Sequence, residues 1–217
     1  IVFPADFMVE VRVGTQSNGQ GHETAYTQIV AERLGLEWDS IRVVQGDSDL
    51  TPTGGGTGGS RSLYMQGTAL LDAAAKVVSQ GKIAAGEQLE AAAADIEFVD
   101  GRFRIKGTDR AIGLLDLAAR LRQSGGTAAG LDAVVDSNPA GATFPYGCHI
   151  AELEVDPATG AIALLRYVVA DDMGRILNPP IARGQIQGGV VQGLGQALLE
   201  QAAYDAGGQL LSGTFMD

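Results

Sequence analysis

The 217-residue sequence has few of the side chains from which proteins build metal and disulfide sites. It has one cysteine, Cys148, and two histidines, His22 and His149. A single cysteine excludes an internal disulfide framework, a zinc-finger set and an iron–sulfur cluster ligated by cysteines of this chain alone. Two histidines make a histidine-rich catalytic metal cage unexpected. We therefore expect no metal ligands here, and we expect any demanding chemistry to depend on a bound group.

Long apolar runs and basic clusters are missing too. A membrane span needs about 18 consecutive apolar residues, and no such run is present. The 15 basic residues face 26 acidic ones, for a net charge of −11, so no basic surface is expected to neutralise a phosphate backbone. The sequence thus predicts a protein that binds neither nucleic acid nor membrane.

The beginning of the sequence also lacks an initiator methionine and the pattern of a signal peptide. Ile1 is not preceded by methionine, and no charged segment leads into an apolar one, so we expect no signal peptide. We interpret the sequence as a fragment or a processed chain. A cytoplasmic location is expected, with periplasmic export of the full-length parent left open.

Glycine, in contrast, is abundant. The 31 glycines are about twice the usual share of roughly 7%, and they follow no collagen period. Such an excess indicates many tight turns, or many places where the backbone closely approaches something else. The positions where the glycines gather are therefore the candidate functional positions.

Hydrophobic periodicity predicts an α+β fold, with mainly antiparallel hairpins and segregated helices. A Pro- and Gly-containing stretch near 125–145 suggests a subdivision between two α+β subdomains. The expected strands cover 7–15, 41–45, 95–105 (a hairpin turning at Asp100-Gly101), 147–156 and 161–171. The expected helices cover 22–36, 63–94 (with a break near Gly81 or Gly86), 112–121 and 179–204.

The first glycine cluster, SNGQGHET at 17–24, lies between an expected strand and an expected helix. A helix amino terminus leaves backbone N–H groups unpaired and suits an anion or a polar heterocycle. Gly19 and Gly21 allow close approach, and the Gln20 amide offers both donors and an acceptor. The alternative is an ordinary capped turn.

The second cluster, TPTGGGTGGSRS at 51–62, formally contains the G-x-G-x-x-G pattern of dinucleotide-binding proteins. It does not follow directly on a strand, and no Walker lysine is present, so the pattern is weak evidence. The alternative is a low-complexity loop that binds no ligand. Arg61 favours an anion site, because a guanidinium beside backbone amides suits a phosphate.

The third cluster lies in the last expected helix. Its five glycines cost about 3 to 5 kcal/mol relative to alanine. Close packing against another backbone explains them equally well as a ligand lying along the helix, toward which Gln192 would point. Both explanations can hold together.

Together the three clusters resemble the large, molybdopterin-binding subunit of the molybdenum hydroxylases of the xanthine oxidase and aldehyde oxidase type. The pattern is most similar to the branch with the aerobic carbon monoxide dehydrogenase large chains. The similar segments are VGTQSNGQGHET, GGTGGSRS, ELEVDPATG, DDMGRILNP, GQIQGGVVQGLGQALLE and the terminal SGTFMD. The resemblance covers essentially the whole chain.

This resemblance implies a cofactor site. Gln20 and Gly21 match the glutamine-containing cofactor turn of the family, and Gln192 matches the glutamine of its glycine-rich helix. Its phosphate-cradling loop matches Gly59, Ser60, Arg61 and Ser62. The implied cofactor is molybdopterin with molybdenum, either plain or as the cytosine dinucleotide.

The resemblance also implies what this chain lacks. The catalytic glutamate of the family lies beyond the equivalent of SGTFMD, and acids such as Glu23 or Glu200 match no catalytic position. We therefore expect no catalytic residue here and no turnover by the isolated chain.

The implied parent oxidises an aldehyde, an N-heterocycle or a similar small substrate with oxygen from water. Its iron–sulfur and flavin (FAD) centres are expected on partner domains or subunits, in an assembled homodimer. Two other hypotheses stay open: a non-catalytic pterin-binding or interaction domain, and an unrelated nucleotide-binding enzyme that uses the loop at 54–62.

Overall fold

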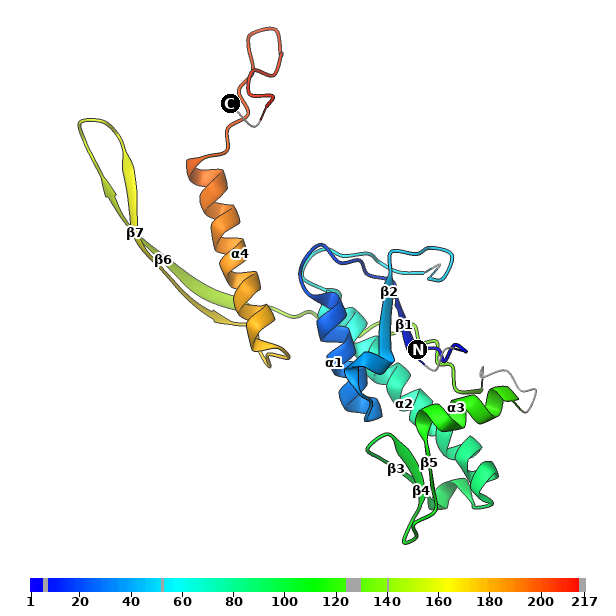
Figure 1. Cartoon of the computed structure of the whole chain (residues 1–217). Coiled ribbons are helices and arrows are strands. Elements are labelled where there is room, and N and C mark those ends of the chain that lie inside the picture. Colours follow the sequence, from blue (N-terminus) through cyan, green and yellow to red (C-terminus); the bar gives the residue numbers. More distant parts are fainter. Residues whose placement is uncertain (6–7, 52, 124–129, 140, 215–217) are drawn as a thin grey trace. The chain divides into compact units, whose positions relative to one another are not determined.

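The computed structural model describes residues 1–5, 8–51, 53–123, 130–139 and 141–214. The expected subdivision near 125–145 and the SGTFMD stretch fall partly outside these ranges. The described chain forms two compact units, Ile1–Ala142 and Thr143–Asp217 (Figure 1).

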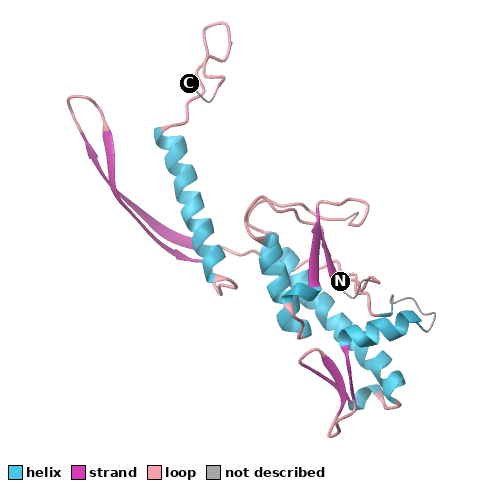
Figure 2. Ribbon diagram, in the orientation of Figure 1, coloured by secondary structure: helices cyan, strands magenta, loops and turns pink. Residues whose placement is uncertain are grey.

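In chain order, the elements of the first unit are β1 (Val9–Val13), α1 (His22–Leu34), a 3-10 turn (Trp38–Ser40), β2 (Ile41–Gln45), α2 (Ser62–Leu89), a second 3-10 turn (Ala93–Asp95), β3 (Ile96–Val99), β4 (Arg102–Ile105), β5 (Ala111–Gly113) and α3 (Leu114–Gln123). Those of the second unit are β6 (Tyr146–Val155), β7 (Ile162–Asp172) and α4 (Pro179–Leu198). Figure 2 shows the helices in cyan and the strands in magenta. The α+β class with antiparallel hairpins is confirmed.

One strand pair runs parallel. β1 and β2 pair in register from Val9 opposite Ile41 to Val13 opposite Gln45. Parallel neighbours need a crossover connection, and α1 provides it. Because both strands leave the pair at the same edge, the segments that follow Val13 and Gln45 begin close together.

Helix α2 is continuous from Ser62 to Leu89, so the expected break near Gly81 or Gly86 is wrong. Both glycines instead allow close approach. A Cβ on Gly81 would lie 2.1 Å from the Phe103 ring, and one on Gly86 would lie 2.8 Å from the carbonyl oxygen of Ala91. Tertiary packing therefore explains glycines that looked like helix breakers.

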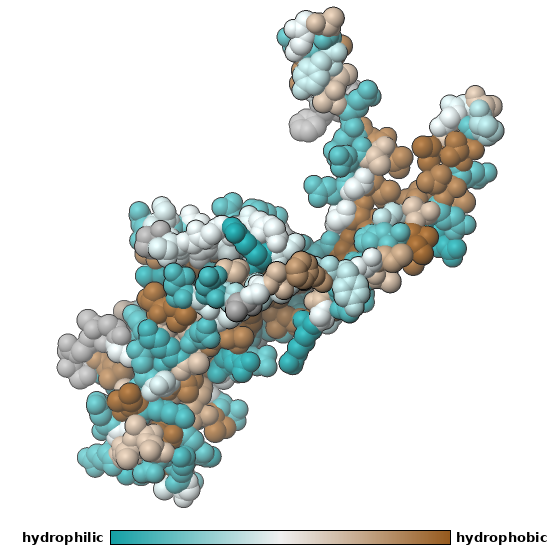
Figure 3. Space-filling view, turned by 180° about the vertical axis from the view of Figure 1, so that it is seen from behind, coloured by the Kyte–Doolittle hydropathy of each residue, from teal (hydrophilic) through white to brown (hydrophobic). Residues whose placement is uncertain are grey.

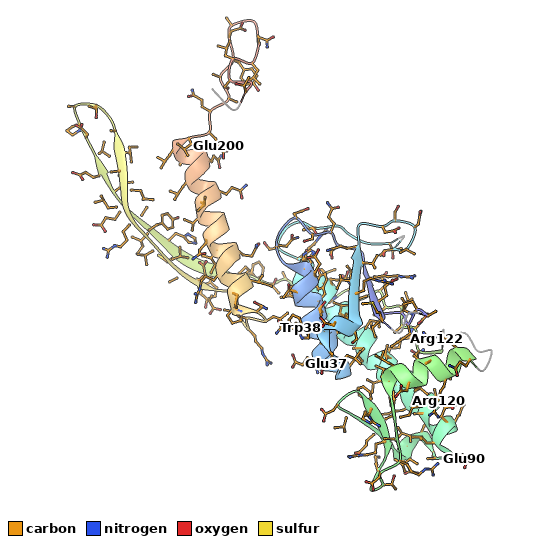
Figure 4. The ribbon with its side chains drawn as sticks, viewed as in Figure 1. Glu37, Trp38, Glu90, Arg120, Arg122 and Glu200 are labelled. Atoms are coloured by element: carbon orange, nitrogen blue, oxygen red, sulfur yellow. The ribbon has the colours of Figure 1, made fainter. Side chains whose placement is uncertain are left out.

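The second 3-10 turn, β3, β4 and α3 pack against α2. The predicted turn at Asp100-Gly101 is confirmed, with φ of 47° and 73° at the two residues. Arg122, on α3 (Figure 4), donates hydrogen bonds to the carbonyl oxygens of Phe3 and Pro4. The largest fully buried side chains of this core include Val9, Tyr26, Val30, Leu34, Val77, Ile96, Phe103, Leu114 and Leu117.

One charged residue lies within this core. Glu10, 5% exposed, accepts hydrogen bonds from Arg12 at 2.6 Å and from Arg42 on the neighbouring strand at 2.7 Å. Burial by itself raises the pKa of Glu10, but the hydrogen bonds and charges of the two arginines outweigh it and hold the pKa below its usual 4.5. The carboxylate therefore joins β1 to β2 in its charged form.

The second unit has no comparable core. β6 and β7 form an antiparallel hairpin with an irregularity at Glu152/Leu153. α4 ends at Leu198 rather than at the expected Tyr204, and Asn178 caps its beginning by accepting the N–H of Ile181. No described residue of this unit is buried, and Figure 3 shows hydrophobic side chains gathered on its surface.

None of the described helices is both long and apolar enough to cross a membrane.

The arginine-bound carboxylate yields a stability prediction. Replacing Glu10 by glutamine should lower the free energy of unfolding by about 1 to 3 kcal/mol at neutral pH, because its charge-assisted hydrogen bonds to two arginines weaken. Since the folded-state pKa is lowered, the contribution is complete above pH 4.5 and is lost as the pH falls through the lowered value. Denaturant unfolding at several pH values measures both effects.

Glu97→Gln is the matched control, because Glu97 pairs with Arg104 at the surface. Its expected cost is below about 1 kcal/mol. A cost for Glu10→Gln no larger than that of the control would contradict the prediction.

Candidate cofactor-binding site

The glutamine turn between β1 and α1 is held by its own polar groups. Gln20 accepts the N–H of Asn18 at 2.5 Å and donates to the carbonyl oxygen of Gln16 at 3.3 Å. Gly21 precedes α1 with φ of 76°, and no side chain caps the helix. The turn thus presents the amino terminus of α1 without a protein cap.

Glu23 fastens this turn to the end of β2. Its carboxylate accepts hydrogen bonds from the Ser17 hydroxyl at 3.2 Å and from the Gln45 amide at 2.5 Å. Gln45 also lies 3.4 Å from Nδ1 of the buried His22. Glu23, which matched no catalytic position in the sequence, therefore has a structural role in this turn.

The glycine-rich loop lies directly against the glutamine turn. The N–H of Gly56 donates to the carbonyl oxygen of Gly14 at 3.1 Å. A Cβ on Gly54 would lie 2.4 Å from Cα of Gly14, so both positions must be glycine for the backbones to come this close. Thr57 adds side-chain hydrogen bonds to Gln16.

The start of α2 is tied to α1 through Tyr26. Its buried phenol lies 2.9 Å from the Thr15 hydroxyl and also hydrogen-bonds the hydroxyl of Ser62. Burial raises the pKa of Tyr26 above its usual 10.0 although these hydrogen bonds act against it, and the charge of Glu23 adds to the rise. The phenol is therefore neutral and available as a donor at physiological pH.

Between Thr57 and Ser62 the glycine-rich loop is exposed. Gly59 and Ser60 have φ of 60° and 55°, which turns the chain sharply into α2. Arg61 donates to the carbonyl oxygen of Gly55 and precedes a second helix without a side-chain cap. Apart from the adjacent residues, no heavy atom of the described chain lies within 4 Å of a Cβ built on Gly58 or Gly59.

The structure thus brings most of the predicted cofactor-binding residues into one region. Gln20, Gly21, Gly59, Ser60, Arg61 and Ser62 all belong to the two joined loops of the first unit. Gln192 is not among them, because it lies exposed on α4 of the second unit. Their contacts to a cofactor remain predictions.

In the second unit a hollow of about 330 Å³ separates the hairpin from α4. It is lined by His149, Tyr167, Gly189, Val190, Gly193, Leu194 and Ala197. His149 lies 3.3 Å from both the Asp171 carboxylate and the Tyr167 hydroxyl. A Cβ on Gly189 or Gly193 would meet no described atom within 4 Å, so packing inside this unit does not explain these glycines.

One acid lies just after the end of α4. Glu200, labelled in Figure 4, has its carboxylate 3.1 Å from the position of a Cβ on Gly195. Neither this acid nor Glu23 had matched a catalytic position in the sequence.

Residues 3–217 match the family of molybdopterin cofactor-binding domains. The chain belongs to this family. It is 40% identical to the 6-hydroxypseudooxynicotine dehydrogenase complex subunit gamma of Paenarthrobacter nicotinovorans, over 96% of this chain and 27% of that protein. It is 38% identical to the carbon monoxide dehydrogenase large chain of Hydrogenophaga pseudoflava, over 95% and 26%.

The fold agrees with that of the family. The solved structure of reconstituted CO dehydrogenase from Oligotropha carboxidovorans superposes with a TM-score of 0.80 and 36% identity, over 95% of this chain and 26% of that chain. The chain spans about a quarter of the length of these relatives. The predicted resemblance to the molybdenum hydroxylases is confirmed, and an unrelated nucleotide-binding fold is not favoured.

The contact between the two loops gives a second prediction. Gly54→Ala should destabilise the chain by about 1 to 3 kcal/mol, because the new methyl group would overlap the backbone of Gly14. Gly58→Ala is the matched control, since its Cβ would meet nothing within 4 Å. Denaturant unfolding of both variants checks this, and equal stabilities would contradict the observed contact.

Proposed function

We propose that the two joined loops of the first unit bind molybdopterin, as its cytosine dinucleotide, within a molybdenum hydroxylase. The observation that carries this proposal is the convergence of two helix amino termini without side-chain caps beside two interlocked glycine-rich loops. Membership in the molybdopterin-binding family supports it.

The donors of this region fit an anionic, polar cofactor. The N-termini of α1 and α2 carry partial positive charge and suit phosphate oxygens. Arg61 is exposed beside them and adds a full positive charge. The backbone of Gly58 and Gly59 is open to a close approach, because a Cβ at either position would meet no described atom within 4 Å beyond the adjacent residues.

Each residue has a separate task in this proposal. The Gln20 amide would exchange its contacts within the turn for hydrogen bonds to the cofactor. Gly59 and Ser60 would offer backbone N–H groups, and Arg61 a charge-assisted contact. Ser62 would act mainly through Tyr26, its partner in the structure. Gln192 would contribute from α4.

The cofactor, when bound, supplies the two-electron oxidation of the substrate with oxygen from water. For the parent we propose an aldehyde, an N-heterocycle or a similar small molecule as the substrate. Iron–sulfur and flavin centres would lie on partner subunits or domains of an assembled homodimer. The terms "large chain" and "subunit gamma" in the names of the relatives support a multi-subunit assembly.

A test of the loop assignment is Gly59→Val in the full-length parent. The valine would project into the space where the cofactor approaches, so molybdenum and pterin content should fall severalfold. Gly107→Val is the matched control, because Gly107 also has a positive φ and open surroundings but lies in the turn between β4 and β5. Full cofactor content in folded Gly59→Val would overturn the assignment of this loop.

The helix assignment is tested separately. Gln192→Ala should lower the molybdenum content of the parent, because an amide that would hydrogen-bond the cofactor is removed, with an expected loss of about threefold to tenfold. Gln196→Ala changes another exposed amide of the same helix and should have no effect. Metal analysis and pterin fluorescence of the purified proteins measure both. Equal molybdenum contents would remove Gln192 from the site.

A further inference from the structure

Thr57, which the sequence did not single out, makes a side-chain link between the two loops. Its hydroxyl accepts the N–H of Gln16 at 3.0 Å and donates to the carbonyl oxygen of the same residue at 2.6 Å. One hydroxyl therefore satisfies both backbone groups of a residue 41 positions away. A hydroxyl can do this because it is both a donor and an acceptor.

Thr57 lies at one end of the exposed segment 58–61. At the other end, Ser62 is fastened to α1 through Tyr26. Gly59 and Ser60 lie between Thr57 and Ser62, and Gln20 lies on the turn to which Thr57 is hydrogen-bonded. The other contacts in this part of the interface are the backbone approach of Gly54 and the hydrogen bond of Gly56, both to Gly14.

The proton of the Thr57 hydroxyl goes to the carbonyl oxygen of Gln16 and one of its two lone pairs receives the N–H, so the hydroxyl has no proton left to donate to a ligand. The residue is also half-buried, whereas Gly58, Gly59 and Ser60 are exposed. Its position suits control of loop spacing rather than cofactor contact.

We propose that Thr57 is a positioning residue that sets the spacing between the Gln20 turn and the Gly59–Ser60 segment, and so preorganises the cofactor site. This inference rests on the proposed function. Its physical basis is that a loop fixed at both ends loses less conformational freedom when it binds a ligand.

The test uses three variants of the full-length parent. Thr57→Val keeps the shape but removes the hydroxyl, and Thr57→Ser keeps the hydroxyl. Thr108→Val is the matched control, because the Thr108 hydroxyl also donates to a carbonyl oxygen (Ile105) and accepts an N–H (Arg110), but in the turn between β4 and β5.

The first measurement needs no cofactor. Hydrogen exchange of the apo-protein should be about tenfold faster at the Gln16 amide in Thr57→Val, because a hydrogen bond that protects this amide is lost. Thr57→Ser should restore the slow exchange, and Thr108→Val should not affect Gln16. Unchanged exchange in Thr57→Val would overturn the link itself.

The second measurement is molybdenum and pterin content after a fixed dialysis. Thr57→Val should lose cofactor about tenfold faster than the unaltered parent, with rescue by Thr57→Ser and no effect of Thr108→Val. Faster exchange together with full cofactor retention would overturn the positioning role. If Gly59→Val loses cofactor and Thr57→Val does not, the inference fails alone, whereas an unaltered parent without molybdopterin overturns the proposed function and the inference together.

Discussion

Because β1 and β2 run parallel, the chain leaves both strands at the same edge, and this single constraint determines where the candidate site lies. The segment after Val13 becomes the glutamine turn, and the segment after Gln45 becomes the glycine-rich loop. Ligands of open α/β units commonly bind beyond the carboxyl ends of parallel strands. The small two-stranded pair of this chain follows the same geometry, and Glu10 reinforces it by bonding an arginine on each strand.

Joining two loops at this edge has a steric requirement and a polar one. The steric requirement is met by Gly14 and Gly54, where any side chain would overlap the opposite backbone. The polar requirement is met by Thr57 and Glu23. Thr57 accepts the backbone N–H of Gln16, and Glu23 accepts the hydroxyl of Ser17, so these groups have partners within the chain. No side chain caps the amino termini of α1 and α2, so their first backbone N–H groups are available to an external anion.

The sequence predicted the features that depend on local chemistry. The hairpin at Asp100-Gly101 follows from residues that tolerate positive φ, and α1 follows from its periodicity and from Gly35 at its end. The sequence did not predict the parallel pairing or the continuity of α2 through Gly81, because both depend on contacts with residues distant in the chain. The link between Thr57 and Gln16 escaped for the same reason, since no spacing rule connects a loop threonine to a backbone 41 residues earlier.

The second unit differs from the first in how little stabilises it from within. A two-stranded hairpin is marginal by itself, and the glycines of α4 cost about 3 to 5 kcal/mol relative to alanine. None of its described residues is buried, while Ile150, Leu153 and Val168 are among the exposed large apolar side chains of the hairpin. Burial inside the unit therefore cannot offset the cost of ordering it. The open space over its glycines leaves the backbone of α4 accessible to a group from outside this unit. A ligand that reaches Gln192 would use the same open backbone.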